Sequence, residues 1–171
     1  MELKEILAQK DIAKKSFVAD MEKRAPLVGI DLSEVADDEM ELWHEVAQGV
    51  SALGVPVVAF IAKGKTAPWK LPLLTPQERD GMSTYMPVDI IVLPSPSKRS
   101  QAFQNATVPV CERADDTHDF DPIKEAGNGF FYQNKNKWEI FAAIVRALET
   151  FRFPYDWKNV QKEGYRKVSL L

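Results

Sequence analysis

Short apolar runs alternate with amphipathic segments in the first third of the chain. Residues 25–33 (APLVGIDLS) and 55–62 (VPVVAFIA) predict two strands, and the second has the continuous apolar character of a strand buried on both faces. Between them, Asp37 or Asp38 precedes apolar residues at helical spacing and Gly54 follows them, which predicts a capped helix. A strand, a helix and a buried strand within ~35 residues indicate a right-handed βαβ unit.

The same alternation continues beyond a segment rich in proline and glycine. Residues 88–94 (VDIIVLP) and 107–111 (TVPVC) predict two more strands, with a short helix or turn at residues 97–105 between them. The segment 63–87 is too long for a simple connection. Within it, Thr75-Pro76-Gln77-Glu78 places a threonine cap before a proline at the first helical position, which predicts the start of a helix.

The longest amphipathic pattern lies in residues 127–152. Gly127-Asn128-Gly129 predicts a turn, and residues 130–132 (FFY) predict a short aromatic strand. Asn136 is placed to cap the next helix, and Glu139 three residues later completes a pattern similar to a capping box. The core face of that helix is predicted to carry the apolar residues that recur at spacings of three and four. These residues are Trp138, Phe141, Val145, Leu148 and Phe151.

Helices are also predicted at both ends of the chain. Residues 2–22 carry spaced apolar residues among many charges, and we interpret Lys10, Lys14 and Lys15 as part of a solvated helical face. Residues 155–168 predict a final helix. Its inward residues are expected to be Trp157, Val160 and Tyr165.

Composition supports a globular protein and excludes several classes of partner. The 171 residues are 45% hydrophobic and 27% charged, which fits one domain spanning residues 1–171. The formal net charge of −3 gives no global attraction to nucleic acid or to anionic membranes. No apolar run approaches the ~20 residues of a membrane span, and no secretory signal is visible, so a cytoplasmic location is expected. The single cysteine, Cys111, excludes an internal disulfide and is expected to be a buried, unreactive thiol.

Together, these patterns predict an α/β fold: a three-layer sandwich with a mostly parallel, Rossmann-like sheet and helices on both faces. In such sheets, ligands bind beyond the carboxyl ends of the strands. The run Ser95-Pro96-Ser97-Lys98-Arg99-Ser100 follows the end of a predicted buried strand. The hydroxyls of Ser95 and Ser97 with the cations of Lys98 and Arg99 are therefore a candidate phosphate or sulfate site, and the alternative is an ordinary basic turn.

Two further groups of residues have competing interpretations. The loop containing Asp115, Asp116, His118, Asp119 and Asp121 could chelate a cation, but it lacks the glycine and terminal glutamate of a calcium loop. We favour a solvated acidic loop and predict no metal site. The aromatic residues of the 63–87 segment either form a platform for sugar rings or a partner surface, or anchor that segment to the body. They are Trp69 and Tyr85.

Three stretches, in this order, resemble the C-terminal nucleotide-binding lobe of glycogen and starch synthases, which are retaining glucosyltransferases of the two-lobed GT-B fold. VDIIVLPS (residues 88–95) resembles a strand that ends in Pro-Ser, and TVPV (107–110) resembles the family's Gly-Thr-Val-Pro-Val strand. Residues 127–152 and 156–167 resemble its Gly-Phe strand, long helix and terminal helix. The resemblance extends loosely back to residues 25–62.

The chain departs from this family at the residues that carry its chemistry. The resemblance implies an arginine and a lysine for the diphosphate after the first strand, but residues 31–38 (DLSEVADD) hold four carboxylates there, which is the wrong sign. Residues 96–102 (PSKRSQA) stand where the family has Glu-Pro-Cys-Gly-Leu, and residues 113–116 (RADD) replace its Thr-Gly-Gly. The family's glycine-rich acceptor loop belongs to the other lobe, which this chain is expected to lack.

The resemblance and the departures together predict a diverged glycosyltransferase-like pseudoenzyme. It would be non-catalytic alone and would act as a binding or assembly module for a nucleotide-sugar or glycan, or for a protein partner. The alternative is the nucleotide-sugar-binding part of an active glucosyltransferase that a second lobe completes, with Ser95, Lys98 and Arg99 in place of the usual residues. We assign no catalytic residue, metal, cofactor, nucleic acid or membrane partner, and whether the chain is an enzyme stays open.

Overall fold

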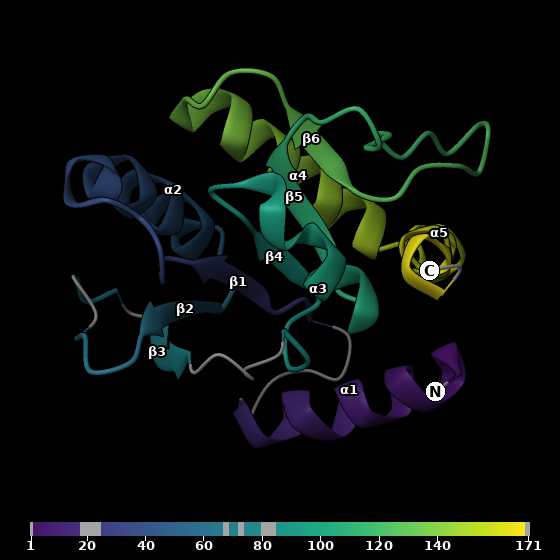
Figure 1. The fold of residues 1–171 in the computed structure, drawn as a ribbon, viewed down its shortest axis with the longest axis horizontal. Helices are drawn as coiled ribbons and strands as arrows, with labels where there is room; N and C mark the ends of the chain where they lie inside the picture. Colours follow the sequence, from purple (N-terminus) through teal and green to yellow (C-terminus); the bar gives the residue numbers. More distant parts are fainter. Residues whose placement is uncertain (1, 18–24, 67–68, 72–73, 80–84, 170–171) are drawn as a thin grey trace.

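The computed structural model describes residues 2–17, 25–66, 69–71, 74–79 and 85–169 (Figure 1). Its centre is a six-stranded parallel sheet in the order β3-β2-β1-β4-β5-β6. The strands are β1 (Val28–Asp31), β2 (Val57–Ala62), β3 (Leu74–Arg79), β4 (Ile90–Val92), β5 (Val108–Glu112) and β6 (Phe130–Tyr132). This is the order of a doubly wound sheet, in which the direction of winding reverses between β1 and β4.

Helices cover both faces of the sheet, as predicted. They are α1 (Leu3–Phe17), α2 (Met40–Ala52), α3 (Arg99–Gln104), α4 (Lys137–Phe151) and α5 (Pro154–Ser169), with short 3-10 turns η1 (Asp37–Glu39) and η2 (Pro96–Lys98). Figure 1 shows α2 and α4 on one side of the sheet and α3 and α1 on the other. The core is correspondingly split, because alternate strand residues such as Val57 and Val58 of β2 join different buried clusters. The predicted three-layer α/β fold is confirmed.

The predicted helix start at residues 75–78 is wrong, because these residues lie in β3. That strand pairs with β2 alone and therefore forms one edge of the sheet, with Pro76 opposite Ala59. An edge strand tolerates proline, because the missing backbone N–H can face away from the ladder. Pairing with β2, which is buried over all but its last residue, outweighed the preference of the Thr-Pro-Gln-Glu sequence for a helix start.

The predicted cap of α2 is also wrong in detail. Asp37 and Asp38 form the 3-10 turn η1 instead, and no side chain caps either η1 or α2. The C-terminal prediction holds, since Gly54 follows the helix with a φ of +74° and its N–H donates to the carbonyl oxygen of Ser51.

The cap of α4 is confirmed, and its predicted core face is confirmed only in part. The Asn136 side chain accepts the N–H groups of Trp138 and Glu139 at 3.1 and 3.0 Å. The Glu139 carboxylate, however, accepts the N–H groups of the two residues before the cap region, Gln133 and Asn134, at 3.1 and 2.9 Å. It therefore fixes the turn that enters the helix and does not close the reciprocal bond of a capping box.

The most deeply buried stripe of α4 lies beside the predicted one, and Phe141, Leu148 and Phe151 of the predicted stripe pack against the core while only partly buried. Trp138 is 74% exposed, and Phe141 lies half-buried against Gly49 of α2. Small and branched residues allow α2 and α4 to approach closely, whereas the large side chains flank the contact. The buried residues are Ile140, Ala143, Ile144 and Ala147.

Helix α1 is held by lysines that we predicted to be solvated. Lys10 is only 3% exposed, and its Nζ donates to Thr107 Oγ1 at 2.6 Å and to the carbonyl oxygens of Met86 and Asn105. Lys14 forms an ion pair with Asp89 at 2.5 Å. These partners immediately precede β4 and β5, so α1 is attached near the amino-terminal ends of these two strands. Of the three lysines predicted to be solvated, only Lys15 is exposed.

Three smaller expectations have mixed outcomes. In α5, Trp157 and Val160 are buried as predicted, but Tyr165 is only half-buried and Gly164 takes the inward position. Cys111 is buried, and burial raises the pKa of its thiol to about 12, so it stays protonated and unreactive. Among the described residues, no helix is both long and apolar enough to cross a membrane. The single-domain interpretation and the cytoplasmic location stay predictions.

Candidate functional site

The reversal of winding creates a crevice at the carboxyl ends of β1 and β4. Asp31 ends β1, and Leu93, Pro94 and Ser95 follow β4. The crevice has a volume of about 130 Å³. Its charged lining consists of Asp31, Glu34, Glu39, Lys98 and Lys135. This is the position at which doubly wound sheets bind their ligands.

Asp31 is a buried carboxylate whose hydrogen bonds come from neighbouring elements. It is 2% exposed and accepts the Tyr85 hydroxyl at 2.5 Å. The Ser33 N–H and hydroxyl donate to its other oxygen at 2.9 and 2.5 Å. A buried charge needs such partners, because an unpaired one would cost several kcal/mol. Asp31 is therefore part of the framework of the crevice.

Lys98 is directed into the acidic loop after β1. Its Nζ lies 3.3 Å from Asp31 Oδ2, 2.9 Å from Glu34 Oε1 and 3.0 Å from Ser33 Oγ. Across the crevice, Lys135 pairs with Glu39 at 2.8 Å. The two ammonium groups are thus bonded to carboxylates of the protein itself. A phosphate that entered the crevice would have to displace these contacts.

The structure separates the four residues predicted as an anion site. Ser95 and Lys98 line the crevice, whereas Ser97 and Arg99 do not. Ser95 Oγ accepts the Ser97 N–H at 3.4 Å and so caps η2. The Arg99 guanidinium turns away and bonds Asp116 at 2.5 Å and the carbonyl oxygen of Pro96 at 2.7 Å. This hydrogen bond from Arg99 is the main cause of the lowered pKa of Asp116.

The aromatic residues of the 63–87 segment support the anchoring interpretation. Tyr85 is fully buried and packs edge-on against Phe60. Trp69 is half-buried and stacks on His44, with ring centroids 5.3 Å apart. Tyr85 is therefore closed to a sugar ring, and one face of Trp69 is covered by His44.

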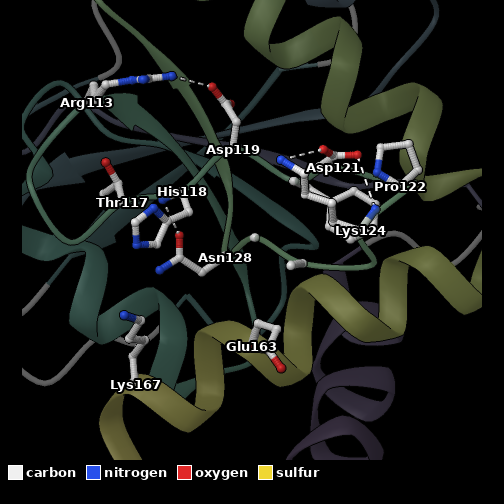
Figure 2. Close-up of a pocket in the computed structure, with 13 residues that line it drawn as sticks. Arg113, Thr117, His118, Asp119, Asp121, Pro122, Lys124, Asn128, Glu163 and Lys167 are labelled. Carbon is white, nitrogen blue, oxygen red and sulfur yellow. Dashed lines mark hydrogen bonds and ion pairs between the residues drawn. The ribbon is translucent and has the colours of Figure 1, made fainter.

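The loop with five acidic or histidine positions is not simply solvated. Asp119 pairs with Arg113 and Arg146 at 2.8 and 2.9 Å, and it also accepts the Phe131 N–H. Within the described ranges, no group of three or more histidine, cysteine or acidic side chains could hold a metal ion. Instead, the loop forms one wall of a second hollow of about 690 Å³, whose other wall is α5 (Figure 2).

Residues 127–129 fix the shape of that loop, although the turn predicted there lies earlier, at residues 122–125. Gly127 has a φ of +128°, and a Cβ at this position would lie 2.5 Å from the Asp119 carbonyl oxygen and against the backbone of Phe120. Asn128 is 2% exposed, and its side chain accepts the His118 N–H at 3.0 Å and donates to the Asp116 carbonyl oxygen at 3.2 Å. The loop is therefore held from inside, and only glycine fits at its tightest point.

No family model matches this chain. By sequence, it is 34% identical over 91 residues to glycogen synthase 1 of Synechocystis sp., covering 48% of this chain and 19% of that protein. It is 32% identical over 92 residues to the glycogen synthase of Trichodesmium erythraeum, covering 48% of this chain and 20% of that protein. Its fold superposes with a TM-score of 0.67 on the catalytic domain of starch synthase IV from Arabidopsis thaliana, bound to ADP and acarbose.

The structural match covers 91% of this chain but 38% of the starch synthase chain, at 16% identity. The sequence alignments likewise span about a fifth of each glycogen synthase. The resemblance predicted from the three short stretches is confirmed, and it concerns one part of a larger type of enzyme. The chain is thus similar in sequence to part of the glycogen synthases, and it has the α/β fold of part of a starch synthase catalytic domain.

Proposed function

We propose that this lobe is a diverged glycosyltransferase-like module that binds or assembles with a partner and has no catalytic activity alone. The observation that carries this proposal is the closure of the crevice by its own ion pairs. Lys98 is bonded to Asp31 and Glu34, and Lys135 is bonded to Glu39. The remaining volume of about 130 Å³ is below the ~300–1,000 Å³ of typical small-molecule sites.

The charge of the crevice also opposes a nucleotide diphosphate. Transfer from a sugar nucleotide requires donors that stabilise the leaving diphosphate. Here three carboxylates outnumber the two lysines, and Asp31 is buried and accepts hydrogen bonds from Ser33 and Tyr85. Releasing Lys98 toward a ligand would leave Asp31 with a weaker set of partners, which costs free energy. Glycosyl transfer at this position is therefore disfavoured both by the small volume of the crevice and by its negative charge.

An alternative function is the nucleotide-sugar-binding part of an active glucosyltransferase that a second lobe completes. Two observations favour it. The matched starch synthase domain is bound to ADP and acarbose, and this chain covers only 38% of it. In addition, Ser95 and Lys98 do lie at the crevice, so a rotation of Lys98 away from Glu34 would present one cation to a phosphate.

A thermal-shift and calorimetric titration separates the two functions. The ligands are UDP-glucose, ADP-glucose, UDP, ADP and maltooligosaccharides, each with the wild type and with Lys98→Ala. A ligand at a hundredfold excess over its dissociation constant stabilises the folded state by about 2.7 kcal/mol. The proposed function predicts no shift with any nucleotide. A shift with a nucleotide that Lys98→Ala abolishes would establish the alternative.

Arg99→Ala is the matched control for this experiment. Arg99 is adjacent to Lys98 and carries the same charge, but it bonds Asp116 and lies outside the crevice. In the alternative function, Arg99→Ala leaves nucleotide binding within about twofold of the wild type, because it removes no direct contact. Equal losses in both variants would indicate attraction by general charge and not a site at the crevice.

A further inference from the structure

The larger hollow beside α5 has features that neither the fold nor the proposed function explains. Its volume of about 690 Å³ lies within the ~300–1,000 Å³ range of small-molecule sites. It shares no lining residue with the crevice at β1 and β4. The two hollows are thus separate parts of the surface.

The walls of this hollow are held in place by internal bonds. Asn128 and Gly127 tie the two limbs of the loop together, as described above. Phe120 is 8% exposed and packs edge-on against Phe130, so one apolar side of the hollow is anchored in the core. A site that is formed before its ligand arrives does not lose binding free energy to ordering the loop.

The charged lining of the hollow is balanced, because three cations (Arg113, Lys124 and Lys167) face three carboxylates. Its lining carboxylates already have cationic partners: Asp119 pairs with two arginines, Asp121 lies 3.6 Å from Lys124, and Glu163 pairs with Arg166 at 3.0 Å. Because all three lining carboxylates are paired in this way, Lys167 is the lining cation that has no ion-pair partner among the described residues.

Two donors lining the hollow are available to a ligand. The side chains of Lys167 and His118 have no hydrogen bond or ion pair with any residue that the structure describes. Figure 2 shows Lys167 extending from α5 toward the side of the hollow on which His118 and Asn128 lie. Asp116 is close enough to feel the charge of Lys167, but it is already bonded to Arg99 at 2.5 Å.

We propose that this hollow binds a small molecule that carries a phosphate group. Lys167 and His118 would donate hydrogen bonds to the phosphate oxygens. A phosphate monoester carries a charge close to −2 and three strong acceptor oxygens, which suit an ammonium group without an ion-pair partner beside a ring N–H donor. The rest of the hollow leaves room for a sugar-sized body against Phe120 and Pro122. The proposal does not depend on whether the crevice binds a nucleotide.

The test is calorimetric titration at low salt with orthophosphate, glucose 1-phosphate and glucose. We expect heat of binding from the two phosphate compounds and none from glucose. Lys167→Ala and His118→Ala are each expected to weaken binding about tenfold, while Lys98→Ala at the crevice leaves it unchanged. Tighter binding of glucose 1-phosphate than of orthophosphate would identify a phosphorylated sugar, and equal binding would identify the phosphate group as the only feature recognised.

Lys162→Ala provides the matched control, because Lys162 is another exposed lysine of α5 that does not line the hollow. It is expected to bind both phosphate compounds as the wild type does. Both exposed variants of α5 should fold, and circular dichroism checks this. The absence of binding by either phosphate compound, or an equal loss in Lys162→Ala and Lys167→Ala, would refute the proposed site.

Discussion

Burial of Lys10 makes the stability of this lobe depend on pH in a defined direction. Burial lowers the pKa of Lys10 from 10.5 to about 7, although the nearby charge of Asp89 acts in the opposite sense. The unfolded chain therefore holds the proton more tightly than the folded chain between these two values. It follows from linkage that the free energy of unfolding rises as the pH rises from about 7 to 10.5.

The size of the effect follows from the two pKa values. One pKa unit corresponds to about 1.4 kcal/mol, so the charged form of Lys10 costs the fold about 5 kcal/mol at pH 6. At pH 9 the folded protein holds Lys10 neutral, and the remaining cost of removing its proton is about 2 kcal/mol. The wild type should thus gain about 3 kcal/mol between pH 6 and pH 9 relative to a variant without the amine.

The assay is urea unfolding of the wild type and of Lys10→Met at pH 6, 7, 8 and 9. Methionine keeps an unbranched chain of similar length but removes the bonds to Thr107, Met86 and Asn105, which adds an offset common to every pH. The test is therefore how the difference in the free energy of unfolding between the wild type and Lys10→Met changes with pH, and not the size of that difference at one pH. Lys4→Met, on the exposed side of the same helix, should give a constant difference. Parallel profiles for the wild type and Lys10→Met would refute the reasoning.

Three further predictions test single elements by urea unfolding. Gly127→Ala should lower the free energy of unfolding by more than about 3 kcal/mol, because the backbone of Phe120 and Asp119 occupies the position of the new Cβ. Gly64→Ala should lower it by about 1 kcal/mol, because Gly64 has a φ of +76° but open space around it. Equal losses would contradict this. Asn136→Ala should cost about 1 kcal/mol through loss of the α4 cap, and an unchanged stability would argue against that cap. Trp138→Ala should change the free energy of unfolding by less than about 0.5 kcal/mol, because Trp138 is exposed. Trp157→Ala should lower it by about 3–5 kcal/mol, because Trp157 is buried. The reverse order would support the predicted core face with Trp138 in it.

Strands could be predicted from the sequence wherever burial on both faces makes them continuously apolar. β1, β2, β4, β5 and β6 all lie within such predicted runs. β3 could not, because an edge strand is buried less, and its Thr-Pro-Gln-Glu sequence has a stronger local preference for a helix start than for a strand. Its place in the sheet depends on pairing with β2, from which it is separated by residues 63–73, and not on its own local sequence.

The core face of α4 shows a different limit of the sequence. Two apolar stripes run along this helix at the same spacing, one with large residues such as Trp138 and one with smaller residues such as Ile144. Periodicity cannot choose between them. The choice depends on α2, where Gly49 admits Phe141 at the flank and leaves the narrow gap between the helices to the smaller stripe.

The position of the crevice was predictable, and its charge balance was not. Ser95 and Lys98 were placed correctly at the end of a buried strand. The partner of Lys98, however, is the acidic loop after β1, which is about 65 residues away in sequence and becomes adjacent only because β1 pairs with β4. The same pairing turns a run of four charged or hydroxyl residues into two separate groups, with Arg99 bonded to Asp116.

The hollow beside α5 lacks the negative charge that its own loop suggests. Residues 115–121 carry four aspartates, yet Asp116 and Asp119 are paired with arginines, two of which, Arg99 and Arg146, come from α3 and α4. At the crevice, Lys98 and Lys135 are bonded to carboxylates of the protein itself. Since anion binding needs cations that are not already neutralised, we propose the phosphate site at the α5 hollow, where Lys167 lines the wall, and not at the crevice. The phosphate titration and the nucleotide titration test these two statements independently.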